Sequence, residues 1–234
     1  MVLAELSGGL GNQLFQWAYA RGLSENVKCD ASKMRNYAGV PRTFSLGPFG
    51  IRDSRAATGR DRYIAIGARG YEFVDIGEGD DVRVRGVWMG EGPWRHAAAD
   101  VRRVLDVPGP TIDAIAVHVR RTDFLLPNSP MVELGADYYR RALERVPRNL
   151  PVLVFTDAPD WARQNVPGIL IDEPDQYRAM WLMSRCRHHV IANSSFSWWA
   201  AWLGEKGRVV APSRWLKNND AVTTQIVPER WATV

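Results

Sequence analysis

The chain has 234 residues, of which 46% are hydrophobic, and a formal net charge of +4 at pH 7, which fits a globular protein with a sizeable core in one large or two small domains. Its 30 basic residues are interspersed with 26 acidic ones instead of forming a basic run, and this argues against nucleic-acid binding. The two cysteines, Cys29 and Cys186, are too few and too far apart to indicate a disulfide scaffold or a zinc site.

The amino terminus starts directly with an apolar segment and a glycine-rich stretch, without the charged and apolar regions of a secretion signal. No window approaches the ~20 apolar residues that a membrane-spanning helix needs. We therefore expect a cytoplasmic protein that associates at most peripherally with the inner face of the membrane.

The first 22 residues indicate a strand, a glycine-rich turn and a helix, at 2–6, 7–13 and from there to Gly22. Glycines in such a turn let the backbone approach a ligand, and the helix start favours an anion or a polar sugar. The turn lacks the third glycine of a dinucleotide-binding fingerprint, but Asp30 lies roughly where that fold places its ribose-binding acid. A nicotinamide-dependent oxidoreductase is therefore an alternative.

Residues 32–110 have a looser pattern, with short β-like runs at 63–66, 71–76 and 82–88 and a predicted helix at 94–105. The sequence Val107-Pro108-Gly109-Pro110 is the strongest linker signal in the chain. It predicts a domain boundary near residue 110, with domains 1–110 and 111–234.

The second half alternates regularly between strands and helices. The expected strands are 112–119, 152–156, 169–171, 188–192 and 208–211, and the expected helices are 136–146, 160–165, 175–186 and 195–204. Such alternation predicts a parallel sheet, which binds ligands beyond the carboxyl ends of its strands.

One of these strands ends in His118-Val119-Arg120-Arg121-Thr122-Asp123. Successive side chains of a strand alternate between faces, so Arg120 and Arg121 point in opposite directions. An arginine fork grips phosphate oxygens bidentately, and one of the pair is suited to a pyrophosphate. The other interpretation is a structural ion pair, with Asp123 as the obvious partner.

The segment after the strand at 188–192 predicts a second phosphate contact. Asn193 is a natural N-cap for the following helix, whose first turn offers free N–H groups and the hydroxyls of Ser194 and Ser195. Trp198 and Trp202 lie one turn apart and predict a core face on the same helix.

The sequence predicts no metal site. His188 and His189 are neighbours on a strand and face opposite sides, and no Asp-x-Asp motif occurs. If a nucleotide diphosphate binds, arginine and the helix start must neutralise it.

Taken together, these motifs resemble those of the α-1,2-fucosyltransferases of glycosyltransferase family 11. The matching segments, in order, are 8–16, 118–123, 155–157, 182–186 and 192–200. They span most of the chain, and the first, second and last are specific.

The resemblance implies an α/β, GT-B-like architecture of two Rossmann-type domains whose parallel sheets face each other across a cleft. It also implies inverting, metal-independent transfer of L-fucose from GDP-β-L-fucose, without a cofactor, to a hydroxyl of an oligosaccharide or glycolipid, with the 2-hydroxyl of a galactose as the expected position. Domain 111–234 would hold the donor, and domain 1–110 would lie on the acceptor side.

The resemblance also assigns roles to individual residues. Arg120 would grip the donor diphosphate as the catalytic residue, and Asp157 would lie near the nucleoside. Arg121 and Asp123 would support the site from behind. The donor-binding set it implies is Gly11, Asn12, Gln13, His118, Arg120, Asp157, Asn193, Ser194, Ser195 and Phe196.

Two departures from the family pattern stand out. Thr122 replaces a residue that is often glycine, and the chain is short between residues 32 and 110. Acceptor binding is therefore not transferred from the resemblance. A catalytically inactive protein that binds a nucleotide or carbohydrate is a further alternative.

Overall fold

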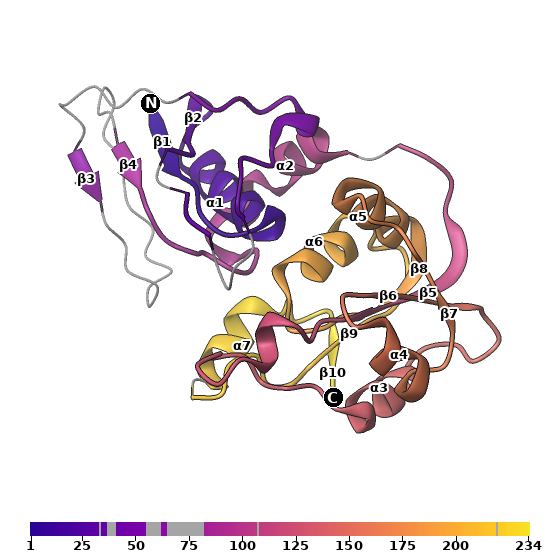
Figure 1. The fold of residues 1–234 in the computed structure, drawn as a ribbon. Helices are drawn as coiled ribbons and strands as arrows, with labels where there is room; N and C mark the ends of the chain where they lie inside the picture. Colours follow the sequence, from indigo (N-terminus) through magenta and orange to yellow (C-terminus); the bar gives the residue numbers. More distant parts are fainter. Residues whose placement is uncertain (33, 37–40, 55–61, 65–81, 107, 219) are drawn as a thin grey trace. The chain divides into compact units, whose positions relative to one another are not determined.

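The computed structural model describes residues 1–32, 34–36, 41–54, 62–64, 82–106, 108–218 and 220–234. The chain divides into two compact units, Met1–Asp106 and Val107–Val234. Each unit has its own parallel sheet with helices packed on it (Figure 1). The predicted α/β class with parallel sheets is therefore confirmed.

The sheet of the first unit has the strand order β2-β1-β4-β3. Its strands are β1 (Val2–Glu5), β2 (Val27–Asp30), β3 (Arg62–Ile64) and β4 (Val82–Val84). All pairs are parallel, and Glu5 lies opposite Asp30 at the carboxyl ends of β1 and β2. The run expected at 71–76 lies outside the described residues.

Helix α1 (Leu10–Leu23) follows the glycine-rich turn and buries an apolar face that includes Leu14 and Phe15. The helix predicted at 94–105 is divided into a 3₁₀ segment η2 (Gly92–Ala97) and helix α2 (Ala98–Leu105). Trp94 has a non-helical φ of −129° and is fully buried. A Cβ on Gly22 of α1 would lie 2.9 Å from Trp94 Cβ, so a glycine lets the two segments approach closely. A further 3₁₀ segment is η1 (Gly47–Phe49).

The second unit contains a larger parallel sheet of order β10-β9-β8-β5-β6-β7. Its strands are β5 (Ile112–Val119), β6 (Val152–Thr156), β7 (Ile169–Leu170), β8 (Cys186–Val190), β9 (Val209–Ala211) and β10 (Ala232–Thr233). The helical segments are η3 (Asp123–Leu125), α3 (Ala136–Leu143), α4 (Pro159–Asn165), α5 (Gln176–Arg185), α6 (Ser195–Leu203) and α7 (Asp220–Ile226). Strands β5 and β6 have the predicted bounds, whereas β8 starts two residues early because it follows α5 without a loop.

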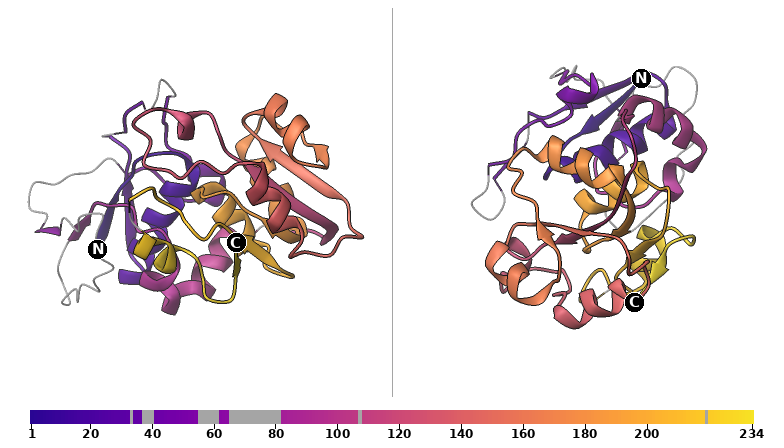
Figure 2. Two further views of the ribbon diagram at one scale, coloured as in Figure 1. Left: turned by 90° about the horizontal axis from the view of Figure 1, so that it is seen from below. Right: turned by 90° about the vertical axis from the view of Figure 1, so that its right-hand side faces the viewer.

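Helices cover both faces of this sheet, as Figures 1 and 2 show, with α5 and α6 on one side and α3 and α4 on the other. On β5, Ile115, Val117 and Val119 join a core cluster with Tyr138 and Tyr139 of α3. The intervening residues of β5 face α5 and α6. This arrangement directs the side chain of His118 towards the start of α6.

Helices α5 and α6 pack against each other at their carboxyl ends. A Cβ on Gly204, the residue that ends α6, would lie 1.9 Å from the carbonyl oxygen of Ser184. Any side chain there would push α6 away from α5. Trp198 and Trp202 are buried on α6, and the predicted tryptophan core face is confirmed.

Candidate functional site

Polar residues gather at the carboxyl ends of three neighbouring strands of the second sheet, β8, β5 and β6. Arg120 follows β5, Asp157 follows β6, and Asn193 lies between β8 and α6. Arg120 Nη1 is 3.2 Å from Asp157 Oδ2, and the rings of His118 and Phe196 are 5.6 Å apart. The fold thus brings together groups that are up to 78 residues apart in sequence.

The guanidinium of Arg120 is held by two carboxylates and is still partly open to solvent. Its Nε donates to Asp123 Oδ1 at 2.9 Å, and its Nη2 lies 2.7 Å from the same oxygen. The ring of Phe124 lies 5.7 Å from its Cζ. Because 27% of the side chain is exposed, the Arg120 guanidinium can contact an anion without changing its position.

Arg121 points the other way, as the strand alternation predicts. Its guanidinium lies over the ring of Trp161 at 4.0 Å, pairs with Glu133 at 2.7 Å and donates to the Leu134 carbonyl. Only 11% of the side chain is exposed. Arg121 therefore stabilises the position of the loop before α3.

Asp123, the expected ion-pair partner after the strand, pairs with Arg120, whereas Arg121 pairs with the neighbouring loop. Asp123 begins the 3₁₀ turn η3, and this turn carries its carboxylate back to Arg120, three residues earlier. Alternation of side chains ends where the strand ends, so a strand register cannot assign the partner of Asp123.

Asp157 is bonded mainly to the turn that follows β5. Its Oδ1 accepts from Arg121 N at 2.8 Å, and its Oδ2 accepts from Thr122 N at 3.2 Å and from Thr122 Oγ1 at 2.5 Å. The side chain is 20% exposed. In this structure its oxygens hold the turn beside Arg120 in place. The sequence predicted a position near the nucleoside for Asp157 and did not predict this structural contact.

His118 is a neutral imidazole in this environment. The side chain is buried, and burial, followed by the charge of Arg120, lowers its pKa from 6.5 to about 4. Its Nδ1 is buried and has no hydrogen-bond partner among the described residues. A neutral histidine can offer a hydrogen bond to a ligand without competing for the positive role of Arg120.

The start of α6 differs from the prediction in its cap. The N-cap is Ser194, which makes no side-chain cap hydrogen bond, so the prediction of Asn193 as N-cap is wrong. Asn193 instead donates from Nδ2 to the carbonyls of Val132 and Trp215 at 2.8 and 3.0 Å. Its buried Oδ1 has no partner among the described residues. Ser195 and Phe196 are half-buried beside it.

In the first unit, the glycine-rich turn is fastened by side chains of α1. Gly8 has a φ of +74°, and a Cβ there would lie 2.5 Å from Asn12 Nδ2. Gln13 is fully buried; it donates to the carbonyls of Gly8 and Thr43 and accepts from Ser45 N. In this structure the Gln13 amide is thus bonded to the protein itself, and its donor-binding role stays a prediction. Gly11 is buried within α1 and Asn12 is half-buried.

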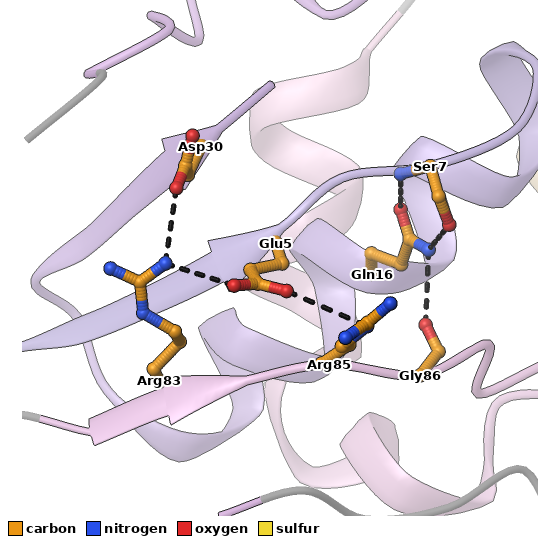
Figure 3. Close-up of polar contacts among 7 residues, drawn as sticks. All are labelled: Glu5, Ser7, Gln16, Asp30, Arg83, Arg85 and Gly86. Carbon is orange, nitrogen blue, oxygen red and sulfur yellow. Dashed lines mark hydrogen bonds and ion pairs between the residues drawn. The ribbon is translucent and has the colours of Figure 1, made fainter. Parts of the chain in front are cut away.

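Gln16, which the sequence does not single out, has a comparable role (Figure 3). Its Oε1 accepts from Ser7 N at 2.9 Å, and its Nε2 donates to Ser7 Oγ and to the Gly86 carbonyl. These bonds join the turn after β1 to the segment after β4. Partners this distant in sequence give no short-range signal.

Figure 3 also shows a buried charge cluster at the carboxyl ends of β1 and β2. Arg83 Nη1 lies 2.9 Å from Glu5 and 3.1 Å from Asp30, and all three side chains are buried. Burial alone would raise the pKa of Asp30, but hydrogen bonds from Ser32 and the charge of Arg83 outweigh it, and the pKa is lowered. Asp30 is thus paired with Arg83 of the protein itself. Its position in the sequence favoured a dinucleotide site, and this ion pair gives that aspartate a structural role instead.

Three further observations concern metal binding, membrane spans and cavities. Among the described residues, no group of three or more His, Cys, Asp or Glu side chains could hold a metal ion. No helix within the described ranges is long and apolar enough to cross a membrane.

A cavity of about 670 Å³ lies near α3 and α4. Its lining includes Leu143, Arg148 and Leu150, and it includes no predicted site residue.

Alpha-1,2-colitosyltransferase of Escherichia coli is 26% identical over an alignment of 290 positions, which covers 100% of this chain and 99% of that protein. The O-antigen biosynthesis glycosyltransferase WbnK of Escherichia coli is 35% identical over 120 residues, or 45% of this chain and 40% of that protein.

A solved structure of a mutant of Arabidopsis thaliana FUT1 in complex with GDP has a similar fold. The TM-score is 0.50 at 11% identity, and the alignment covers 99% of this chain and 75% of that one. The predicted GT-B-like fold class is confirmed. The model of glycosyl transferase family 11 matches residues 95–233, more than half of the sequence. The chain therefore belongs to glycosyl transferase family 11 and is a glycosyltransferase of the fucosyltransferase type.

Proposed function

We propose that this enzyme transfers L-fucose, or a closely related 6-deoxyhexose, from its GDP-linked donor to a hydroxyl of a glycan, with inversion at the anomeric carbon. The expected product is an α-1,2 linkage, with the 2-hydroxyl of a galactose in an oligosaccharide or glycolipid as acceptor. The unit Val107–Val234 binds the donor, and the unit Met1–Asp106 serves the acceptor side.

The observation that carries this proposal is the partly exposed guanidinium of Arg120 at the carboxyl end of β5. The neutral His118 and the uncapped start of α6 lie on the same edge of the sheet. A fixed cation and the N–H groups at a helix start together suit a diphosphate. The unpartnered Oδ1 of Asn193 is a hydrogen-bond acceptor, which suits a hydroxyl or N–H group of the nucleotide sugar.

The chemistry is a single displacement. The acceptor oxygen forms a bond to the anomeric carbon while the bond from that carbon to the diphosphate oxygen breaks, and the acceptor proton is lost late. Positive charge builds on the sugar and negative charge on the leaving GDP, so a preorganised cation at the diphosphate lowers the barrier. Arg120 carries that role, and we propose that no metal ion is needed because Arg120 and the α6 N–H groups meet the charge.

Ligand binding separates this proposal from the oxidoreductase alternative. GDP should raise the melting temperature, whereas NAD and NADP should not. A ligand at 100 times its Kd adds about 2.7 kcal/mol to the free energy of unfolding, so the shift is easily measured. Stabilisation by NAD or NADP without stabilisation by GDP would end the transferase proposal.

Turnover separates the proposal from a catalytically inactive binding protein. Hydrolysis of GDP-fucose to GDP and free fucose needs no knowledge of the acceptor and should depend on Arg120. Arg163→Lys is a matched control, because Arg163 lies in the same unit, is 62% exposed and pairs with its helix neighbour Asp160. GDP binding without any turnover by the parent would support the inactive protein instead.

The donor sugar is decided by competition. One relative that covers the whole chain is named for colitose, which is L-fucose without its 3-hydroxyl. We propose L-fucose as the preferred donor, and the ratio of kcat/KM for GDP-fucose and GDP-colitose tests it. A ratio below one would make this enzyme a colitosyltransferase without changing the reaction type.

A further inference from the structure

We propose that Thr122 and Asp157 are positioning residues that fix the guanidinium of Arg120 before the donor arrives. This inference rests on the donor-binding role of Arg120 proposed above, and it gives Asp157 a task different from nucleoside contact. Thr122 occupies the position where the family pattern often has glycine, and its hydroxyl has a specific partner here.

The carboxylate of Asp157 joins the end of β6 to the turn after β5. Three of its contacts come from that turn: the backbone N–H groups of Arg121 and Thr122 and the hydroxyl of Thr122, at 2.8, 3.2 and 2.5 Å. All three groups are hydrogen-bond donors, and the two carboxylate oxygens accept from them, Oδ1 from Arg121 N and Oδ2 from both groups of Thr122. A glycine at position 122 would keep the backbone bond and lose the hydroxyl bond.

The same carboxylate reaches Arg120. Its Oδ2, which accepts from the Thr122 hydroxyl, lies 3.2 Å from Arg120 Nη1. The hydroxyl therefore orients the oxygen that faces the guanidinium. Asp123 holds the other side through Nε and Nη2, at 2.9 and 2.7 Å.

This arrangement holds the guanidinium from two directions. A guanidinium has five N–H donors, and three of them are directed to the contacts of Nε and Nη2 with Asp123 and of Nη1 with Asp157. The remaining donors on Nη1 and Nη2 include the end of the fork, which suits two phosphate oxygens. A long side chain that is already fixed loses less entropy when its ligand binds, so the two carboxylates favour donor affinity although they offset part of the positive charge.

A double-mutant cycle tests whether Thr122 acts through Arg120. Isothermal titration with GDP gives Kd for the parent, Thr122→Val, Arg120→Lys and the double variant. Valine keeps the shape of threonine and removes the hydroxyl. We expect Thr122→Val to raise the Kd about tenfold in the parent and by less than about twofold in the Arg120→Lys background, because the residue that it positions is already gone.

Rescue and a matched control complete the test. Thr122→Ser restores the hydroxyl and should bind GDP within about twofold of the parent. Thr111→Val removes a comparable threonine hydroxyl, bonded to Lys206 Nζ at 2.8 Å before the start of β5, and should leave the Kd unchanged. If Thr122→Val lowers the melting temperature more than Thr111→Val does, Thr122→Ala replaces it in the same cycle.

The outcomes are distinct. Equal effects of Thr122→Val in both backgrounds, or no effect in the parent, would overturn the positioning role and leave the proposed function intact. A parent that binds no GDP at all would overturn the proposed function and this inference with it. Loss of binding in Thr122→Ser as well as in Thr122→Val would overturn the role of the hydroxyl, because serine keeps it, and would show that the turn does not tolerate substitution.

Discussion

Beside the glycine-rich turn of the first unit, the amides of Gln13 and Gln16 are bonded to their own chain, whereas at the carboxyl edge of the second sheet the amide of Asn193 and the ring of His118 each have a buried atom without a partner among the described residues. Gln13 uses its amide nitrogen and oxygen for Gly8, Thr43 and Ser45. In contrast, His118 Nδ1 and Asn193 Oδ1 are buried without such bonds. A buried polar atom without a hydrogen bond costs free energy. A hydrogen bond from each of these two atoms to a ligand would remove that cost.

The largest expected effect concerns the two arginines after β5. Arg120→Lys keeps the charge but loses the fork, and should lower kcat for GDP-fucose about 100- to 1000-fold. Arg121→Lys loses the contact with Trp161 and should instead cost about 1–2 kcal/mol of stability, a shift of several degrees in melting temperature, with kcat of the folded enzyme nearly unchanged. A stable but inactive Arg121→Lys beside a normally active Arg120→Lys would reverse the assignment.

The next effect tests the structural role of the glycine-rich turn. Gln13→Ala removes three buried hydrogen bonds and should lower the free energy of unfolding by about 3 kcal/mol. The Kd for GDP should stay within about twofold, measured by titration under conditions where the variant is folded. Gln225→Ala, on an exposed position of α7, is the control and should cost less than about 0.5 kcal/mol. A large rise in Kd without destabilisation would instead support the predicted donor-binding role of Gln13.

A smaller effect should appear on acidification. Burial is the first cause that lowers the pKa of both His118 and His189 to about 4. Between pH 6.5 and pH 4 the unfolded chain therefore binds protons that the folded chain does not, and stability falls as the pH falls through this range. Each histidine should cost about 2 kcal/mol at pH 5.

Denaturant unfolding at pH 7.5 and pH 5.0 measures this loss. His189→Gln keeps a donor for the Met183 carbonyl, which His189 Nε2 contacts at 2.9 Å, and cannot take up the proton. We expect its loss on acidification to be about 2 kcal/mol smaller than that of the parent. An equal loss in both proteins would mean that His189 titrates normally in the folded chain.

The smallest expected effect is that of chelation. EDTA should leave the rate of GDP-fucose turnover unchanged, because Arg120 and the α6 N–H groups are proposed to meet the diphosphate charge. The assay is run with and without EDTA, followed by addition of Mn²⁺ or Mg²⁺. Loss of activity with EDTA and recovery with either ion would require a metal in the mechanism.

Sequence patterns predicted most of the second sheet, because a regular alternation of strands and helices leaves few choices. The bounds of β5 and β6 and the opposite directions of Arg120 and Arg121 follow from local periodicity. The pairing of Arg121 with Glu133 could not be predicted in this way, because it depends on how the loop after η3 returns.

Side-chain partners across the chain were the least predictable features. Asn193 looks like a helix cap in sequence, yet its amide bonds to carbonyls 61 and 22 residues away. Asp30 looks like a ribose ligand until Arg83 arrives from β4. In both cases the tertiary fold supplied a competing partner that no local pattern encodes.

The tryptophans of α6 give the second unit a built-in optical probe. The rings of Trp198 and Trp202 stack with centroids 6.2 Å apart and planes within 11°, and Trp199 and Trp231 lie against Trp198 at 5.2 and 5.4 Å. Indole rings this close couple their excited states, and such coupling gives an exciton signal in the circular dichroism spectrum. Because α6 begins at Ser195 beside His118 and Phe196, a small rotation of this helix changes the exchange of excitation between the rings, and the native chain reports it without any attached dye.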